Sequence, residues 1–187
     1  LMDPESRRIV RALLVVLLMA ALAFAASLFV PYNVTFDATI TDLEGNASLL
    51  IPNRRPRELT PNPSDPIPLQ LEQSLRLDPG SRATLIFSIN GGQMVADGPA
   101  TIRLAESQRR ATTYGHLRER GEYTLIIEQD GGTARYYFDN ADPPLDQSDI
   151  TIRVERDTTT TTTLREPCWL AGISASGDRV SQPITCR

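Results

Sequence analysis

Two cysteines are the residues whose type and spacing point most directly to chemistry. Cys168 and Cys186 both lie near the C-terminal end of the 187-residue chain. Neither belongs to a C-x-x-C-H haem motif or to a pair of C-x-x-C zinc motifs. We expect a structural disulfide between them, which closes a loop of about 19 residues and contributes roughly 3 kcal/mol in the chain-entropy model. Free thiols and an intermolecular bridge are the alternatives.

Few residues have the types and spacing that catalysis requires. His116 is the single histidine, so a site with two histidine ligands is excluded. The carboxylates of Asp139, Asp142 and Asp146 can collect calcium, but no D-x-D-x-D-G loop is present, and turn formation explains them better. The glycines follow hairpin patterns, not the strand-to-helix turn that binds phosphate. We predict a protein that is not an enzyme and has no catalytic residues, cofactor or metal ion.

The charged residues narrow the class of partner. All 19 cationic residues are arginines, and with 23 acidic residues the net charge is −4. The sequence lacks the clustered basic surface that nucleic acid requires, so we expect no nucleic-acid partner, and no small-molecule substrate. Arg54, Arg55 and Arg57 form a small basic group that can meet lipid phosphates or an acidic partner; a solvated loop is the alternative. Trp169 is the other candidate contact; the alternative is that its side chain packs into the domain beside Cys168.

An uncharged apolar run near the N-terminus decides how the rest of the chain is attached. Residues 12–30 carry no charge, and as a helix these roughly 19 residues would span about 28 Å, close to the thickness of a hydrocarbon core. A cleaved signal peptide is the rival interpretation, because Ala23-Phe24-Ala25 imitates a cleavage site. The run is longer than the 7–15 residues usual for a signal core. We therefore predict a transmembrane helix over residues 9–30 that stays in the membrane.

The arginines that flank this run predict its orientation. Arg7, Arg8 and Arg11 precede or begin it, whereas the first arginine after it is Arg54. The positive-inside rule then places residues 1–8 in the cytoplasm and the C-terminal part outside. We expect a single-pass protein of the cell membrane whose domain faces the periplasm or the cell surface, where disulfides persist.

The remainder of the chain has the patterns of an all-β domain. Polar and apolar residues alternate from Val34 to Ile40, and the same period of two returns after Leu69. Six prolines fall within residues 52–68, which excludes a helix or a central strand there and indicates an extended loop. We predict an antiparallel, sandwich-like domain over residues 31–156, followed by a threonine-rich and disulfide-closed tail over residues 157–187.

One sequence motif occurs twice within this domain. Thr84-Leu-Ile is followed by Asn90-Gly-Gly, and Thr124-Leu-Ile is followed by Asp130-Gly-Gly. The Asn-Gly pair favours a tight type I′ hairpin, because both residues tolerate positive φ. The two copies indicate a duplicated hairpin or a coincidence. Between them, residues 105–121 are expected to form a loop or connection.

The segment from Leu75 to Leu104 resembles the FecR-type extracytoplasmic domain. Matching features are a leucine and a glycine-led step (Leu75, Gly80), the strand Ser81-Arg-Ala-Thr-Leu, the Asn90-Gly turn, and a return to an apolar end at Ile102 and Leu104. The resemblance extends over about Thr39–Leu104 and implies a β-domain outside the membrane. In that family a cytoplasmic portion engages a sigma factor. About eight residues precede the predicted helix here, so we expect the fold of that family to apply to this chain and its signalling function not to apply.

These features together favour a structural function. We expect a non-catalytic accessory subunit of a larger bacterial membrane complex, for example a respiratory or photosynthetic electron-transport complex. Its partners would be other membrane-protein subunits, contacted through the helix and the outer domain, and the lipid bilayer. The alternative is a FecR-like membrane-anchored sensor or ligand-binding ectodomain.

Overall fold

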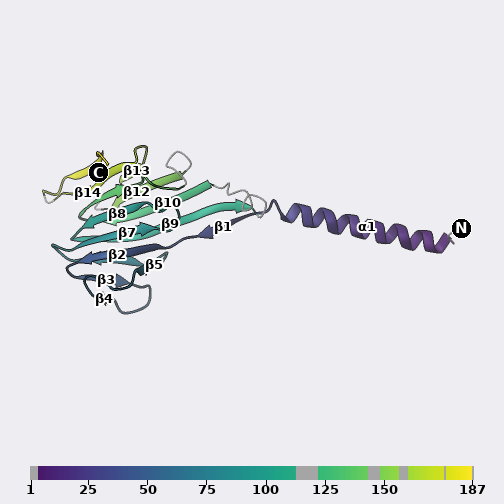
Figure 1. The fold of residues 1–187 in the computed structure, drawn as a ribbon, viewed down its shortest axis with the longest axis horizontal. Helices are drawn as coiled ribbons and strands as arrows, with labels where there is room; N and C mark the ends of the chain where they lie inside the picture. Colours follow the sequence, from purple (N-terminus) through teal and green to yellow (C-terminus); the bar gives the residue numbers. More distant parts are fainter. Residues whose placement is uncertain (1–3, 113–121, 143–147, 156–159, 175, 187) are drawn as a thin grey trace. The chain divides into compact units, whose positions relative to one another are not determined.

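The computed structural model describes residues 4–112, 122–142, 148–155, 160–174 and 176–186. The chain divides into two compact units (Figure 1). Unit 1 comprises Leu1–Asn33 and Arg110–Gly121, and unit 2 comprises Val34–Arg109 and Glu122–Arg187.

Unit 1 contains the helix α1, which runs from Pro4 to Ser27. Pro4 suits the first position of a helix, where its missing N–H has no intrahelical partner to lose. The helix ends in a tight turn, because the N–H groups of Leu28, Phe29 and Val30 bond to carbonyls three residues earlier. Pro31 then begins the first strand.

The helix differs from the expected transmembrane segment over residues 9–30. It ends at Ser27, so its uncharged part covers residues 12–27, about 24 Å of helix, against a hydrocarbon core of roughly 30 Å. Within the described part of the chain, no helix is both long enough and apolar enough to cross a membrane.

Unit 2 is built from strands, as the alternating pattern predicts, and two of these strands, the first and the ninth, extend into unit 1. In chain order the strands are β1 (Pro31–Thr35), β2 (Ala38–Glu44), β3 (Ala47–Leu50), β4 (Arg57–Leu59), β5 (Ile67–Leu69), β6 (Ser74–Leu77), β7 (Arg82–Phe87), β8 (Gln93–Asp97), β9 (Ala100–Thr112), β10 (Glu122–Asp130), β11 (Thr133–Tyr137), β12 (Ser148–Glu155), β13 (Thr160–Thr163), β14 (Cys168–Ile173) and β15 (Arg179–Pro183).

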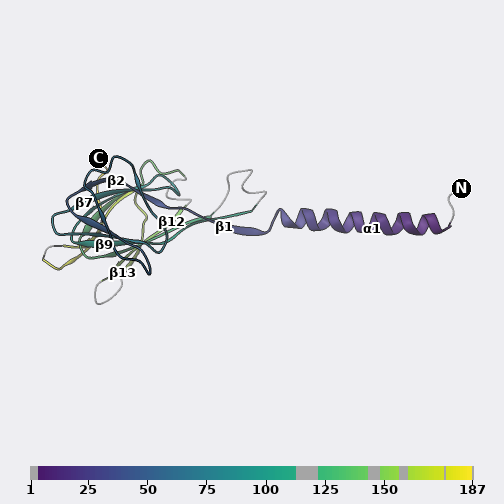
Figure 2. The ribbon, with the colours of Figure 1, turned by 90° about the horizontal axis from the view of Figure 1, so that it is seen from below.

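The strands form two sheets that face each other. The eight-stranded sheet has the order β13-β12-β10-β9-β6-β3-β4, with β1 paired to β9 outside this path, and the seven-stranded sheet has the order β15-β14-β11-β8-β7-β2-β5. Figure 2 separates the two layers, with β2 and β7 in one and β9 and β13 in the other. The predicted sandwich-like β-domain is therefore confirmed.

Short turns carry the chain from one sheet to the other. Gly45-Asn46 leads from β2 to β3, and residues 78–81 lead from β6 to β7. The Ser81 hydroxyl joins these two turns, because it donates to the Asn46 carbonyl at 2.8 Å and accepts from the Asn46 N–H at 2.9 Å. This pair of bonds holds the two sheets in register at one end of the sandwich.

The core lies between the sheets and is almost entirely apolar. Inward positions alternate along each strand, for example Ala83, Leu85 and Phe87 on β7. The largest fully buried side chains are Tyr136, Phe87, Ile40, Leu43, Leu69, Leu75, Leu77, Leu85, Met94, Ile102, Leu104 and Leu125. Both sheets supply them, so neither sheet buries its inner face without the other.

Three expectations about the strands are wrong. The domain is not wholly antiparallel, because β10 and β12 pair in parallel, with Leu125 opposite Ile150. Residues 105–112 of the expected loop or connection are strand instead, since β9 continues to Thr112 and pairs with β1. The Asn90-Gly turn is not type I′, because Gly91 has a positive φ of 72° and Asn90 does not.

Candidate functional site

The proline-rich segment supplies the edge strands at one end of the sandwich. The extended loop expected over residues 52–68 is wrong in part, because two three-residue strands, β4 and β5, lie within it or at its end. Each is the last strand of its sheet. A proline-rich segment suits an edge, because proline has no N–H to donate to a neighbouring strand. Figure 1 shows β3 and β4 at one end of the stacked strands and β13 and β14 at the other.

A cleft of about 480 Å³ opens at this end. Its walls are the strand β4 with Thr60, and residues 62–68 of the following loop and β5. Asn62, at a positive φ of 49°, fixes the loop, because its N–H donates to the Leu43 carbonyl of β2 at 2.8 Å. The cleft is open and mixed in character, since prolines and Ile67 alternate with polar side chains along it.

Of the three arginines of the predicted contact site, Arg57 lines this cleft, and Arg54 and Arg55 precede it in the chain. Ile51-Pro-Asn-Arg54 forms a turn with Pro52 second and Asn53 third at a φ of 58°, closed by a bond from the Arg54 N–H to the Ile51 carbonyl. Arg55 follows, and Arg57 begins β4 and lines the cleft. All three side chains are exposed. Their role as a contact for a partner or for lipid stays a prediction.

The disulfide predicted from the sequence is confirmed at the opposite edge of the sandwich. Cys168 begins β14 and bonds to Cys186 in the C-terminal tail, with an S–S distance of 2.04 Å and a Cα–Cα distance of 5.5 Å. The bond closes the β14–β15 pair at its open end. Threonines of the predicted tail form β13, which pairs with β12.

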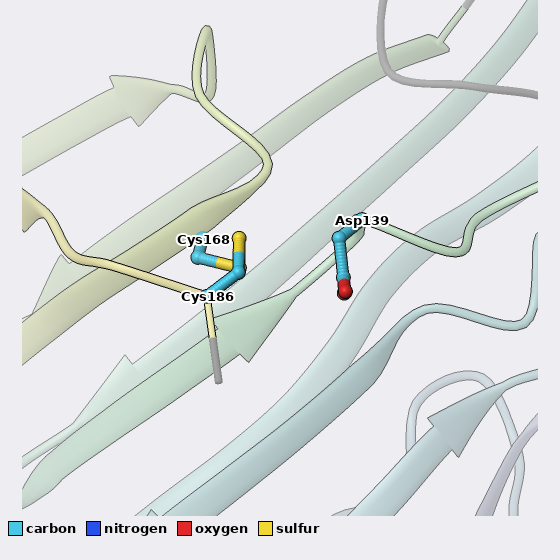
Figure 3. Close-up of side chains that lie close together, drawn as sticks. All are labelled: Asp139, Cys168 and Cys186. Carbon is cyan, nitrogen blue, oxygen red and sulfur yellow. A yellow bond between two sulfur atoms is a disulfide. The ribbon is translucent and has the colours of Figure 1, made fainter.

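Asp139 lies beside this disulfide, as Figure 3 shows. A carboxylate oxygen and the two sulfurs lie within 4.8 Å of one another, and among the described residues this is the one group of three such ligand types. Because the sulfurs are bonded to each other, neither is a thiolate that can bind a metal ion. Asp146, of the predicted acidic group, lies outside the described residues.

Removing the disulfide tests its contribution to stability. We expect the double variant Cys168→Ala, Cys186→Ala to lose about 3 kcal/mol of unfolding free energy, because the unfolded chain regains the freedom of a closed loop. Urea unfolding followed by Trp169 fluorescence measures the loss. The wild type in a reducing agent should lose a similar amount, and equal midpoints for the variant and the oxidised wild type would contradict the prediction.

The structure does not place Trp169 together with Arg54, Arg55 and Arg57, the other residues of the predicted contact site. It lies on β14, at the edge opposite β4, where it is half-buried against the core. Its indole N–H donates to the Ser181 hydroxyl of β15 at 3.1 Å, and Ser181 also bonds to Thr162 of β13 at 3.0 Å. The side chain therefore helps to close this edge, and its contact with a partner stays a prediction.

The outer faces of the sheets carry paired charges. Glu128 lies between Arg103 and Arg153, each 3.4 Å away, on the eight-stranded sheet. On the seven-stranded sheet Asp97 lies 2.7 Å from Arg82 and 3.8 Å from Arg135. The hydrogen bond and charge of Asp97 raise the pKa of the Arg82 guanidinium.

One pair of hydrogen-bonded polar side chains crosses the core between the two sheets. Gln129 on β10 is fully buried, and its amide donates to the carbonyls of Gly131, Gly132 and Ala171 at 3.1–3.4 Å. The Tyr136 hydroxyl donates to its Oε1 at 2.9 Å. The weak sequence signal for this bridge is that Gln129 is a polar residue at the inward position that follows Leu125 and Ile127 on β10.

The described residues hold no arrangement of nucleophile and base that resembles a catalytic site, and His116 lies outside them. The features that remain for function are the cleft with its arginines and the helix α1. Comparison with known proteins gave no match to a protein-family model, a curated protein or a solved structure.

Proposed function

We propose that the protein is a non-catalytic accessory subunit of a membrane complex, to which α1 attaches it. The single observation that carries the proposal is the surface of α1. Every side chain from Arg11 to Ser27 is exposed, and the leucines, valines, Met19 and Phe24 within it are 56–68% exposed. A helix that is apolar on all sides requires apolar surroundings.

Partner helices are the surroundings that fit this helix best. Its uncharged part is shorter than a hydrocarbon core, so contact with longer helices of other subunits would cover it more completely than lipid alone. Small residues at Ala20, Ala21 and Ala25 permit a close approach of another helix. The disulfide supports a location of unit 2 on the oxidising side of the membrane.

Membrane fractionation tests the attachment. We expect the chain to stay with membranes in alkaline carbonate and to elute with larger subunits after extraction in a mild detergent. Leu17→Arg should release it, because an arginine within an apolar helix costs about 2.5–3.5 kcal/mol on the insertion scale. Ile86→Arg is the matched control, since Ile86 is an exposed apolar residue of β7.

Two outcomes would contradict the proposal. Wild-type chain in the soluble fraction would remove the membrane attachment. A membrane-bound chain that elutes alone and binds a small ligand would favour a ligand-binding or sensing ectodomain. The cleft of about 480 Å³ favours that second function, because its size falls in the range of ligand sites.

A further inference from the structure

The two edges of the sandwich are finished in different ways. At the β13 and β15 edge, Ser181 of β15 bonds to both Thr162 and Trp169, and the disulfide closes the β14–β15 pair. At the β4 and β5 edge, the described residues show no such bond between the sheets, and the cleft opens there. The cleft at the second edge leaves room for an additional segment.

The strand β4 ends the eight-stranded sheet with one side unpaired among the described residues. Its register with β3 places Leu59 opposite Ala47, Glu58 opposite Ser48 and Arg57 opposite Leu49. The outer side of an edge strand presents main-chain N–H and C=O groups to which another extended segment can bond.

The charge beside this edge indicates the kind of segment. Arg54, Arg55 and Arg57 have no salt-bridge partner among the described residues, whereas four arginines on the outer sheet faces pair with Asp97 or Glu128: Arg82, Arg103, Arg135 and Arg153. Residues 52–68 carry three arginines against two acidic residues, Glu58 and Asp65, so this segment has a net charge of +1 within a chain of net charge −4. The cleft itself is lined by Arg57 together with both acids, so the excess positive charge lies at Arg54 and Arg55, which precede β4 in the chain. The turn at Pro52 and Asn53 fixes the backbone that carries the arginines.

We propose that β4 receives an extended acidic segment of a partner subunit as an additional strand. Its main chain bonds to the free side of β4, its apolar side chains contact Ile67 and the prolines of the cleft, and its carboxylates meet the arginines. This inference rests on the proposed function, which supplies the partner subunit, and it adds where and how that partner binds. It does not require α1 to lie in a membrane, so the two tests fail independently.

Edge protection is the competing explanation for the same residues. Short strands, prolines and charged side chains are also the means by which a sheet edge avoids pairing. Under that explanation no extended peptide binds. The difference is measurable with a peptide that has the required chemistry.

The experiment uses the full chain in a neutral detergent and a fluorescent peptide of alternating valine and glutamate. Fluorescence anisotropy should show saturable binding that weakens with salt. Replacing all three arginines with glutamine (Arg54→Gln, Arg55→Gln, Arg57→Gln) should weaken binding about tenfold or more, because the carboxylates lose their partners. The matched control, Arg103→Gln, Arg135→Gln, Arg153→Gln, removes the same charge elsewhere and should change affinity by less than about twofold.

Modified peptides test the mode of binding. A peptide with alternate N-methylated residues should not bind, because it lacks main-chain donors on one side. A valine–lysine peptide should not bind either. Circular dichroism melts of both arginine variants confirm that each is folded.

Several results would overturn the inference. These are the absence of saturable binding, equal weakening by the two sets of substitutions, or full binding by the N-methylated peptide. Displacement of the peptide by soluble short-chain phosphatidylglycerol, at concentrations where the peptide itself competes, would assign the arginines to lipid. A dimer of the chain that only the first set of substitutions dissociates would make a second copy the occupant.

Discussion

The substitution Gly132→Ala is expected to lower the free energy of unfolding by about 3 kcal/mol or more. Gly132 lies in the turn from β10 to β11, with a φ of +58°. A Cβ there would lie 2.3 Å from the Asp97 carbonyl oxygen and 2.9 Å from the Ala100 Cβ. The first of these atoms belongs to the main chain of β8, and the second is attached directly to the main chain of β9. Neither atom can move away from the added Cβ unless its strand shifts.

Gly80→Ala separates the two causes of this loss. Gly80 has a φ of +79°, but an added Cβ would meet nothing within 4 Å. It should cost about 1–2 kcal/mol, which is the cost of the left-handed backbone alone. Urea unfolding of the full chain, followed by the single tryptophan Trp169, measures both variants. Equal losses would show that the close approach at Gly132 carries no energy.

The substitution Gln129→Leu has the second large expected effect. It removes the amide that bonds to the carbonyls of Gly132 and Ala171, and it leaves the Tyr136 hydroxyl buried without its acceptor. We expect a loss of about 3 kcal/mol, because an unsatisfied buried polar group costs roughly 1–3 kcal/mol in addition to the bonds lost. Ile127→Leu, at the preceding inward position of β10, is the control for a change of side-chain shape.

Tyr136, the hydrogen-bond partner of Gln129, makes the stability of the protein depend on pH. Burial raises the pKa of the Tyr136 phenol far above its usual range. The neutral phenol is therefore favoured in the folded state, and its contribution is complete below the unfolded pKa near 10 and declines at higher pH. Stability should fall by up to about 1.4 kcal/mol per pH unit above that value.

Tyr136→Phe should remove this alkaline decline while costing about 1–3 kcal/mol near neutral pH, because Gln129 Oε1 then loses its donor. Urea midpoints measured across the alkaline range test both statements. Parallel declines in the wild type and in Tyr136→Phe would assign the alkaline effect to other groups. A Gln129→Leu, Tyr136→Phe double variant that loses less than the sum of the single losses would confirm that the two act as one bridge.

The candidate site was predictable in part. The cysteines are recognisable by type and by their C-terminal context, so the disulfide followed from local sequence. The arginines are recognisable by their proline-rich context, which predicted an extended loop and not the edge strand β4 that Arg57 begins. The cleft was not predictable, because it requires β4 and β5 to end two different sheets. The contact between Asp139 and the disulfide likewise joins segments whose proximity no local pattern records.

The repeated motif shows where local pattern stops deciding the structure. After Thr84-Leu-Ile, the chain turns at residues 90–92 and β8 pairs with β7 in the same sheet. After Thr124-Leu-Ile, the chain turns at Gly131-Gly132 and β11 joins the other sheet, between β8 and β14. Only Gly91 has positive φ in the first turn, whereas both glycines have it in the second. The two segments are therefore not a duplicated hairpin.

The sequence by itself determined the β class, the apolar helix, the exclusion of a helix or a central strand from the proline-rich segment, and the disulfide. Each of these depends on side-chain period, backbone restriction or residue chemistry within a short stretch. Only the tertiary structure decided the sheet to which each strand belongs, the parallel pairing of β10 with β12 and the extension of β9 to Thr112. Those choices depend on the burial of inner faces and on hydrogen bonds between residues far apart in the chain, which a local pattern does not encode.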